Sequence, residues 1–265
     1  MMHTTGLRHL PIITLALLTI VVATLTATVA DAQAAISCQA SRINRSAPVI
    51  ALLADGRSPA LVAAAATIAN EPAAAFAAPV LAGKRARSGS EHPVGIVVLM
   101  TYDAQGNVQN RGAYDLAGVG NDDRNREESR RHLAQCLKQA VAALPKATQT
   151  GGDLLRSLER ASAYAAQSAG GSRAEVVAVG LGRSTIDGQA IAGLDLTAAG
   201  QTQIYSELDR VGLVPDLSSS RVALRFLDPS DGVSSSISAA GVESFAASLC
   251  GRVSARRCTS GVTAY

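Results

Sequence analysis

The 265-residue chain has no tryptophan, and aromatic residues of all kinds make up only 3% of it. Proteins that bind single-stranded nucleic acid stack bases on aromatic side chains, so the composition does not favour that function. Charged residues are 17% of the chain and the formal net charge is +3, a weaker basic excess than nucleic-acid-binding domains usually carry. The hydrophobic content of 48% is too high for an intrinsically disordered chain, so we expect one ordinary folded domain or two small ones.

The signatures of several common enzyme classes are also missing. We find no G-x-S-x-G nucleophile turn, no H-E-x-x-H zinc motif, no C-x-x-C pair and no G-x-x-x-x-G-K-[ST] phosphate loop. Gly180 and Gly182 follow an expected strand, but Thr185 stands where a dinucleotide-binding loop has its third glycine. His132 lies within an expected helix and His92 in a polar loop, so we do not expect a serine hydrolase that uses either one as its base.

The N-terminal segment predicts export. Residues 10–30 form an uncharged apolar run, and Ala-Gln-Ala at residues 32–34 provides the small side chains that signal peptidase accepts. We therefore expect residues 1–34 to be a cleaved signal peptide and residues 35–265 to be a single domain in the extracellular space or cell envelope. The alternative is an uncleaved anchor, since about 20 apolar residues can span a bilayer. A partial lipid-attachment motif at Cys38 leaves a lipoprotein open as a further alternative.

Four cysteines are an even, modest number, compatible with two disulfides in an oxidising compartment. Cys250 and Cys258 lie close in sequence after an expected helix, and we expect them to pair. Cys38 and Cys136 would then form the second pair. Cys136 lies beside an apolar helical stripe, so a buried free thiol is the alternative there.

Apolar runs of strand length alternate with helical patterns along the chain. The strands are expected at residues 49–54, 94–100, 109–116, 175–180 and 222–227. The helices are expected at residues 61–69, 123–144, 150–165, 203–211 and 241–250, with a glycine-rich loop at 181–197 and a tail after Cys250. This alternation predicts a Rossmann-like three-layer α/β/α fold with a mostly parallel central sheet and one antiparallel edge hairpin at residues 94–116.

The order of these elements resembles a von Willebrand factor A-type (VWA) domain over roughly residues 47–250. Residues 49–58 resemble the family's first strand and metal-site turn, residues 150–155 the loop and helix that carry its distal threonine, and residues 176–182 the strand that ends in its "DG" turn. Residues 214–227 and the C-terminal helix with its cysteines are similar to segments of secreted bacterial VWA-like proteins. The resemblance implies a binding module that acts at the carboxyl ends of the parallel strands, often through a divalent cation.

The metal-site motif of the family is degenerate here. The family's site begins D-x-S-x-S, and this chain keeps Asp55 but has Arg57 and Pro59 at the two serine positions, with Ser58 offset by one residue. We therefore expect no cofactor and weak or no binding of divalent cations. We expect Arg57 to pair with Asp55 or Asp153 in the cation's place, or otherwise to point to solvent.

The other expected ligands of that site are also lost. The family's distal threonine falls near Gly152, although Thr150 or Asp153 could reach the site, and Leu181 stands where the "DG" aspartate is expected. Of the family's ligands only Asp55 is clearly retained.

These observations predict an exported, non-enzymatic VWA-like binding module that recognises a protein or a cell-envelope component. The residues expected to take part are Asp55, Arg57, Ser58, Thr150 and Asp153. One alternative is an exported hydrolase that uses Asp55, Asp153 or Asp228, although carboxylates at strand ends are also expected as caps and turn residues. Another is a solute-binding lipoprotein.

We expect no nucleic-acid partner, and a membrane contact through residues 10–30 only if they stay uncleaved. The basic clusters at residues 84–87 and 252–257 are expected to be solvated surface, with contact to anionic envelope polymers or lipid headgroups as the alternative.

Overall fold

The chain divides into two compact units, Met1–Gln39 and Ala40–Tyr265, and of the first unit only Cys38 is described. The computed structural model describes residues 38, 48–70, 93–118, 123–147, 151–171, 173–180, 184–191, 194–225 and 239–261. The predicted signal peptide, residues 84–87, His92, Thr150, Leu181 and Asp228 lie outside these residues. Within the described ranges, no helix has the length and apolar character needed to cross a bilayer.

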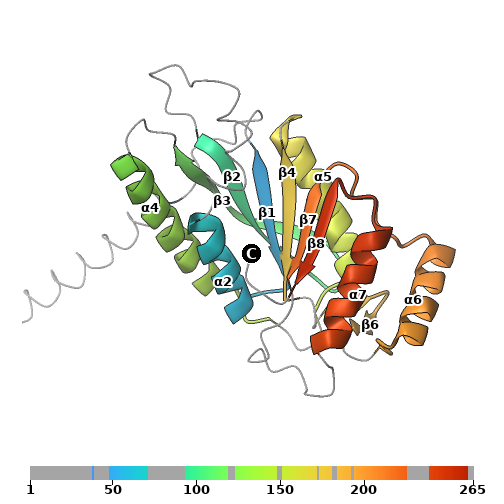
Figure 1. The fold of residues 1–265 in the computed structure, drawn as a ribbon. Helices are drawn as coiled ribbons and strands as arrows, with labels where there is room; N and C mark the ends of the chain where they lie inside the picture. The colour runs from blue at the N-terminus through green and yellow to red at the C-terminus, as the bar shows by residue number, and fades with distance from the viewer. Residues whose placement is uncertain are drawn as a thin grey trace, which may run out of the picture. The chain divides into compact units, whose positions relative to one another are not determined.

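A six-stranded sheet in the order β3-β2-β1-β4-β7-β8 forms the centre of the second unit (Figure 1). The strands are β1 (Val49–Ala54), β2 (Pro93–Tyr102), β3 (Val108–Gly118), β4 (Ala174–Val179), β7 (Arg221–Arg225) and β8 (Arg257–Gly261). β3 pairs with β2 in antiparallel orientation, and every other pair of neighbours is parallel. The predicted parallel sheet with one antiparallel edge hairpin is confirmed.

Helices cover both faces of this sheet and complete the predicted three layers (Figure 1). α2 (Pro59–Asn70) and α4 (Asp123–Ala142) lie on one face, and α5 (Leu154–Ala169), α6 (Ala198–Val211) and α7 (Ala239–Arg252) lie on the other. All residues of β1 and β4 are buried, as continuous apolar runs between two helical layers require. Alternate side chains of the strands pack with α5, α6 and α7 in one core, which contains Leu53, Leu158 and Phe245.

Two segments of the C-terminal half contain strands that were not predicted from the sequence. The predicted loop at 181–197 contains a hairpin of β5 (Thr185–Ile186) and β6 (Gln189–Ala190). The turn residues Asp187 and Gly188 both have positive φ, 48° and 79°, as a type I′ turn requires. The predicted tail after Cys250 contains β8, which pairs with β7 and adds a sixth strand to the sheet.

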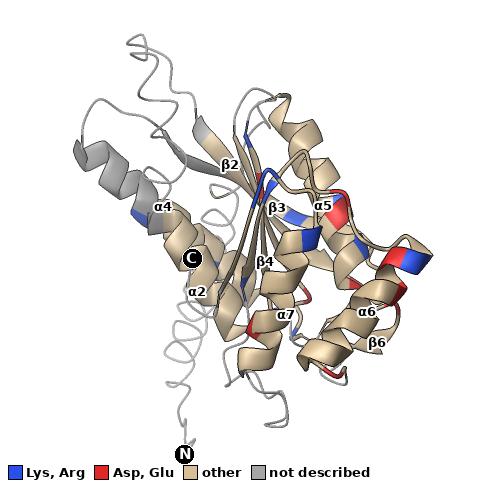
Figure 2. Ribbon diagram, turned by 45° about the vertical axis from the view of Figure 1, so that its right-hand side comes forward, with Lys and Arg blue, Asp and Glu red and all other residues tan. Residues whose placement is uncertain are grey.

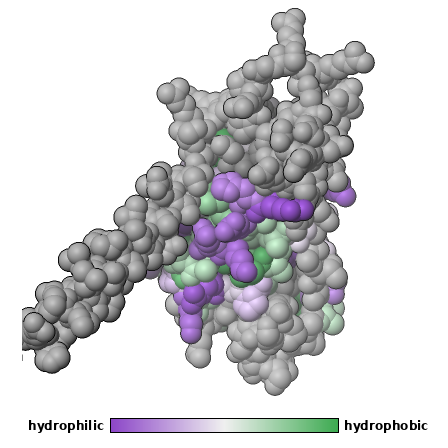
Figure 3. All heavy atoms as spheres, turned by 90° about the vertical axis from the view of Figure 1, so that its left-hand side faces the viewer, coloured by the Kyte–Doolittle hydropathy of each residue, from purple (hydrophilic) through white to green (hydrophobic). Residues whose placement is uncertain are grey.

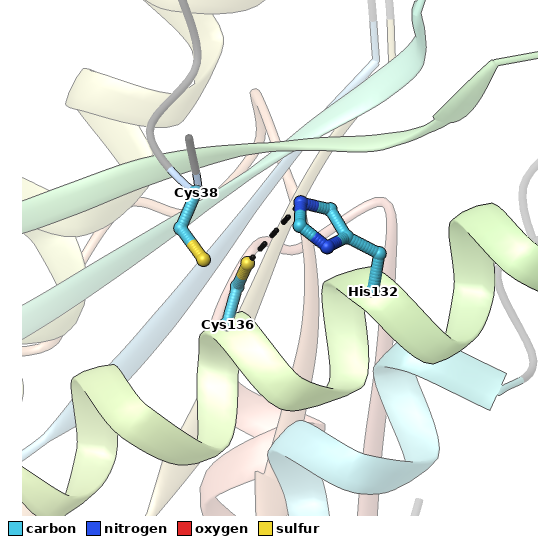
Figure 4. Close-up of side chains that lie close together, drawn as sticks. All are labelled: Cys38, His132 and Cys136. Atoms are coloured by element: carbon cyan, nitrogen blue, oxygen red, sulfur yellow. Dashed lines mark hydrogen bonds between the residues drawn. The ribbon is translucent and has the colours of Figure 1, made fainter. Parts of the chain in front are cut away.

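All four cysteines of the chain are in disulfides. One disulfide joins Cys250 on α7 to Cys258 on β8. Cys38 and Cys136 are also disulfide-bonded, so Cys136 is not a free thiol. His132 lies one turn before Cys136 on α4, and its Nε2 is 3.7 Å from Cys136 Sγ (Figure 4). Two disulfides are typical of proteins from oxidising compartments.

Figure 3 shows hydrophilic side chains interspersed with hydrophobic ones on the coloured part of the surface over α4 and α2. Within residues 131–142 of α4, the exposed residues are Arg131, His132, Gln135, Lys138, Gln139 and Ala142. Val62 of α2 is a large exposed hydrophobic residue, at 39% exposure, and it stands singly. His132 is thus a surface residue of a solvated helix.

Candidate binding surface at the carboxyl ends of the strands

The connections of β1 and β4 leave the sheet in opposite directions. β1 leads into α2 on one face and β4 leads toward α6 on the other, although the two strands are parallel neighbours. In open α/β sheets such a switch point, at the carboxyl ends of the strands, is where ligands usually bind. The predicted binding residues Asp55, Arg57 and Ser58 follow β1 at this end.

Three loops meet at this end of the sheet through backbone hydrogen bonds. Asp153 N, at the start of α5, donates to Asp103 O in the turn after β2 (3.3 Å). Thr185 N, in the β5–β6 hairpin, donates to Gly152 O (2.9 Å). Glycine is required at 152 because a Cβ there would lie 1.9 Å from Asp103 O. We call these three segments, residues 103–107, 151–156 and 184–190, the carboxyl-end loops.

Asp153 holds the carboxyl-end loops together. Its side chain is buried, at 3% exposure, and its Oδ1 accepts a hydrogen bond from Arg156 N (3.0 Å) as the N-cap of α5. Its Oδ2 accepts from Asp187 N at the tip of the hairpin (3.1 Å). A carboxylate is well placed here because the N-terminus of a helix carries partial positive charge. Both oxygens of Asp153 are therefore used to fix backbone, not to bind a ligand.

Asp103 organises the turn after β2 in a similar way. Its Oδ1 accepts from Gln105 N (3.0 Å) and Asn107 N (2.8 Å), and its Oδ2 accepts from Asn107 Nδ2 (3.0 Å). The hydrogen bond from the Asn107 side chain is the main reason that the pKa of Asp103 lies below its usual value. Arg160 on α5 donates to Asn107 Oδ1 (2.6 Å), which ties this turn to the helix. Hydrogen bonds within the protein therefore hold this turn and connect it to α5.

The solvent side of the carboxyl-end loops carries polar side chains of both charges. Arg156 Nη2 and an oxygen of Asp187 are 3.7 Å apart, and both side chains are exposed. Gln105 and Gln189 are exposed beside them. Beneath this layer, Tyr102 OH and Ser184 Oγ lie 2.5 Å apart and are buried. The arrangement is an exposed polar surface on a buried, hydrogen-bonded base.

The predicted residues after β1 have structural contacts. Ser58 is buried and its Oγ accepts from Leu61 N (3.1 Å), so it caps α2. Arg57 Nη1 donates to Ala142 O (2.7 Å), the last residue of α4, where the helix carries partial negative charge. Arg57 N also donates to Pro145 O (2.8 Å). The guanidinium of half-buried Arg57 therefore caps the end of α4, and it makes no ion pair with Asp153 among the described residues.

The structure thus separates the predicted site residues. Asp153 joins the carboxyl-end loops. Arg57 instead connects the segment after β1 to the end of α4, and Ser58 caps the start of α2. Asp55 is half-buried at the end of β1, with both carboxylate oxygens buried. Arg156 and the hairpin tip at Asp187 were not among the residues predicted from the sequence, although an Asp-Gly pair is the usual signal of a two-residue hairpin turn.

Comparison with known protein families and with curated proteins finds no match. Among solved structures, the chain is similar to the human COPII-coat protein Sec24c. The similarity has 13% sequence identity and a TM-score of 0.37, and it covers 82% of this chain and 30% of that chain.

Proposed function

We propose that this chain is an exported, non-enzymatic binding module of VWA-like fold that recognises a protein or a cell-envelope component through its carboxyl-end loops. The observation that carries the proposal is the switch point between β1 and β4, where Asp153 links three loops: its carboxylate accepts from Arg156 N and Asp187 N, and its own N–H donates to Asp103 O. The VWA-like assignment rests on the resemblance of the element order. The sheet order, with its antiparallel β3 at one edge, is compatible with it.

Binding fits these loops better than catalysis does. The hydrolase alternative needs strand-end carboxylates, and both oxygens of Asp153 accept from backbone N–H groups. Arg156, Asp187 and Gln189 instead present exposed polar groups on a rigid base. Loops held by a stable scaffold are the usual place for recognition residues.

Export is supported by two independent features. Residues 10–30 have the length and composition of a signal segment, and the four cysteines are all in disulfides. A disulfide at Cys38 also weighs against the lipoprotein alternative, because lipidation would consume the same sulfur atom. Mass spectrometry of the mature N-terminus distinguishes cleavage after Ala34, a retained anchor and lipidation of Cys38.

The binding proposal is tested with the exported full chain, purified under non-reducing conditions and used as bait in envelope extracts with quantitative cross-linking. We expect a saturable partner whose capture is lost in the double variant Arg156→Gln/Asp187→Asn. The control variant Lys138→Gln removes a charge from the exposed face of α4 and should keep the partner. Repeated absence of a saturable partner would contradict the proposed function, and equal capture by the double variant would contradict the proposed surface.

A further inference from the structure

β8 is an edge strand with a free pairing side in the described part of the chain. It stands at the end of the sheet order and pairs only with β7. Residues 257–260 are exposed or half-buried. An edge strand presents unpaired N–H and C=O groups, so an extended segment of another chain can add to it as a further strand.

Two arginines lie side by side where β7 and β8 begin. Arg221 and Arg257 are register partners and are the first residues of their strands. Val222 and Cys258, the next residues, face α7, since Val222 belongs to the core and Cys258 is bonded to Cys250. Because side chains alternate along a strand, the two arginines share the opposite face of the sheet.

The charge of this arginine pair is not balanced by the described residues. Like charges directly opposite one another weaken strand pairing. Neither Arg221 nor Arg257 has an ion-pair partner among the residues that the structure describes. The next residue in register is Glu175 of β4, which is buried with its carboxylate 3.6 Å from Arg173.

Arg256 adds a third positive group beside this pair. Its backbone N–H donates to Ser220 O (3.1 Å) and its Nε to Ser218 O (3.3 Å), and the side chain is exposed. Arg252, the last residue of α7, differs from these three arginines because it forms an ion pair, with its Nη1 3.1 Å from Asp209 Oδ2. Figure 2 shows Lys and Arg segments gathered around the end of α7 and the strand ends beside it.

We infer that the free edge of β8 is a docking site for an extended acidic polypeptide segment. The segment adds to β8 by main-chain hydrogen bonds, and carboxylates on its alternate residues accept hydrogen bonds from Arg221 and Arg257. Charge complementarity selects an acidic partner over a second copy of this chain, whose β8 would bring the same arginines to the interface. This surface lies at the amino ends of the strands and is separate from the carboxyl-end loops.

The probe is a fluorescein-labelled, end-blocked octapeptide of alternating glutamate and valine, titrated with the full exported chain and followed by fluorescence anisotropy. We expect saturable binding that weakens about tenfold in Arg257→Gln and in Arg221→Gln, the loss of one charge-assisted contact. Lys138→Gln should bind as the natural chain does. Circular dichroism and Tm establish that each variant is folded.

Two control peptides separate edge pairing from simple charge attraction. N-methylation of alternate residues removes ladder hydrogen bonds but keeps the glutamates, so we expect this peptide not to bind. A lysine–valine peptide should not bind either. Equal binding of the N-methylated peptide, unchanged affinity in both arginine variants, or a β8-mediated homodimer that the peptide does not displace would each overturn the inference.

Discussion

The two ends of the parallel strands use their charged residues in opposite ways. At the carboxyl ends, both carboxylate oxygens of Asp153 accept hydrogen bonds from backbone N–H groups, and those of Asp103 accept from backbone N–H groups and from the Asn107 side chain. The guanidinium of Arg57 donates a hydrogen bond to the carbonyl of Ala142. At the amino ends, Arg221 and Arg257 stand next to each other without an ionic partner among the described residues.

This comparison distinguishes charged side chains that bind the protein's own backbone from charged side chains that remain available to a binding partner. A charged residue at the usual ligand-binding end of an α/β sheet does not imply a ligand when its oxygens or nitrogens already bind backbone. The predicted binding residues Asp153, Arg57 and Ser58 hold the scaffold, and the groups that remain for recognition are the exposed ones around them.

The largest effect is expected where the carboxyl-end loops come closest. Gly152→Ala places a Cβ 1.9 Å from Asp103 O and 2.5 Å from the Tyr102 ring, so the backbone must move. We expect a loss of more than about 3 kcal/mol in the free energy of unfolding, measured by urea denaturation. Gly251→Ala is the matched control, because its Cβ would meet nothing within 4 Å and it lies in α7. Similar stabilities for the two variants would show that the loops are not tightly joined.

Removing the Asp153 carboxylate should cost nearly as much. Asp153→Ala loses the cap of α5 and leaves Asp187 N without its acceptor, a combined loss of about 3 kcal/mol. Asp195→Ala is the control, since Asp195 is exposed and bonds only to the start of α6. A loss of less than about 1 kcal/mol for Asp153→Ala would mean that the hairpin is held by other contacts.

At the other end of the sheet, β8 depends on its disulfide. The double variant Cys250→Ala/Cys258→Ala opens a short loop of sequence separation 8, and we expect a loss of about 2.5 kcal/mol. The same variant should weaken binding of the glutamate–valine peptide, because β8 is then less well fixed beside β7. Unchanged stability together with unchanged peptide binding would show that pairing with β7 holds β8 in place without the disulfide.

The fold was predictable where a segment's own pattern decides its structure. β1, β2 and β4 are apolar runs whose burial on both faces follows from their composition. β8, with the sequence RCTSG, has no such pattern, and pairing with β7 and the disulfide to α7 make it a strand. The partner of Arg57 was not predictable because a backbone carbonyl 85 residues away leaves no signal in the sequence.

A smaller effect is expected on acidification. The pKa of Asp103 is lowered by hydrogen bonds from Asn107 and Gln105, so its stabilising contribution is present above the ordinary value of 3.8 and is lost as pH falls through the lowered value. Asp103→Asn should be less stable than the natural chain at pH 6, with the difference shrinking below pH 3.8. Urea denaturation across this range measures it, and a constant difference would exclude the carboxylate as the cause.

The most direct test of the account is thermal unfolding of the purified chain in EDTA, then in millimolar Mg²⁺ and Mn²⁺. If protein hydrogen bonds hold the carboxyl-end loops in place of a cation, Tm is the same in all three conditions. A cation at 100 times its Kd would add about 2.7 kcal/mol, which is readily visible as a shift in Tm. A rise of several degrees with either metal that disappears in Asp55→Ala would contradict the account and establish a working metal site at the end of β1.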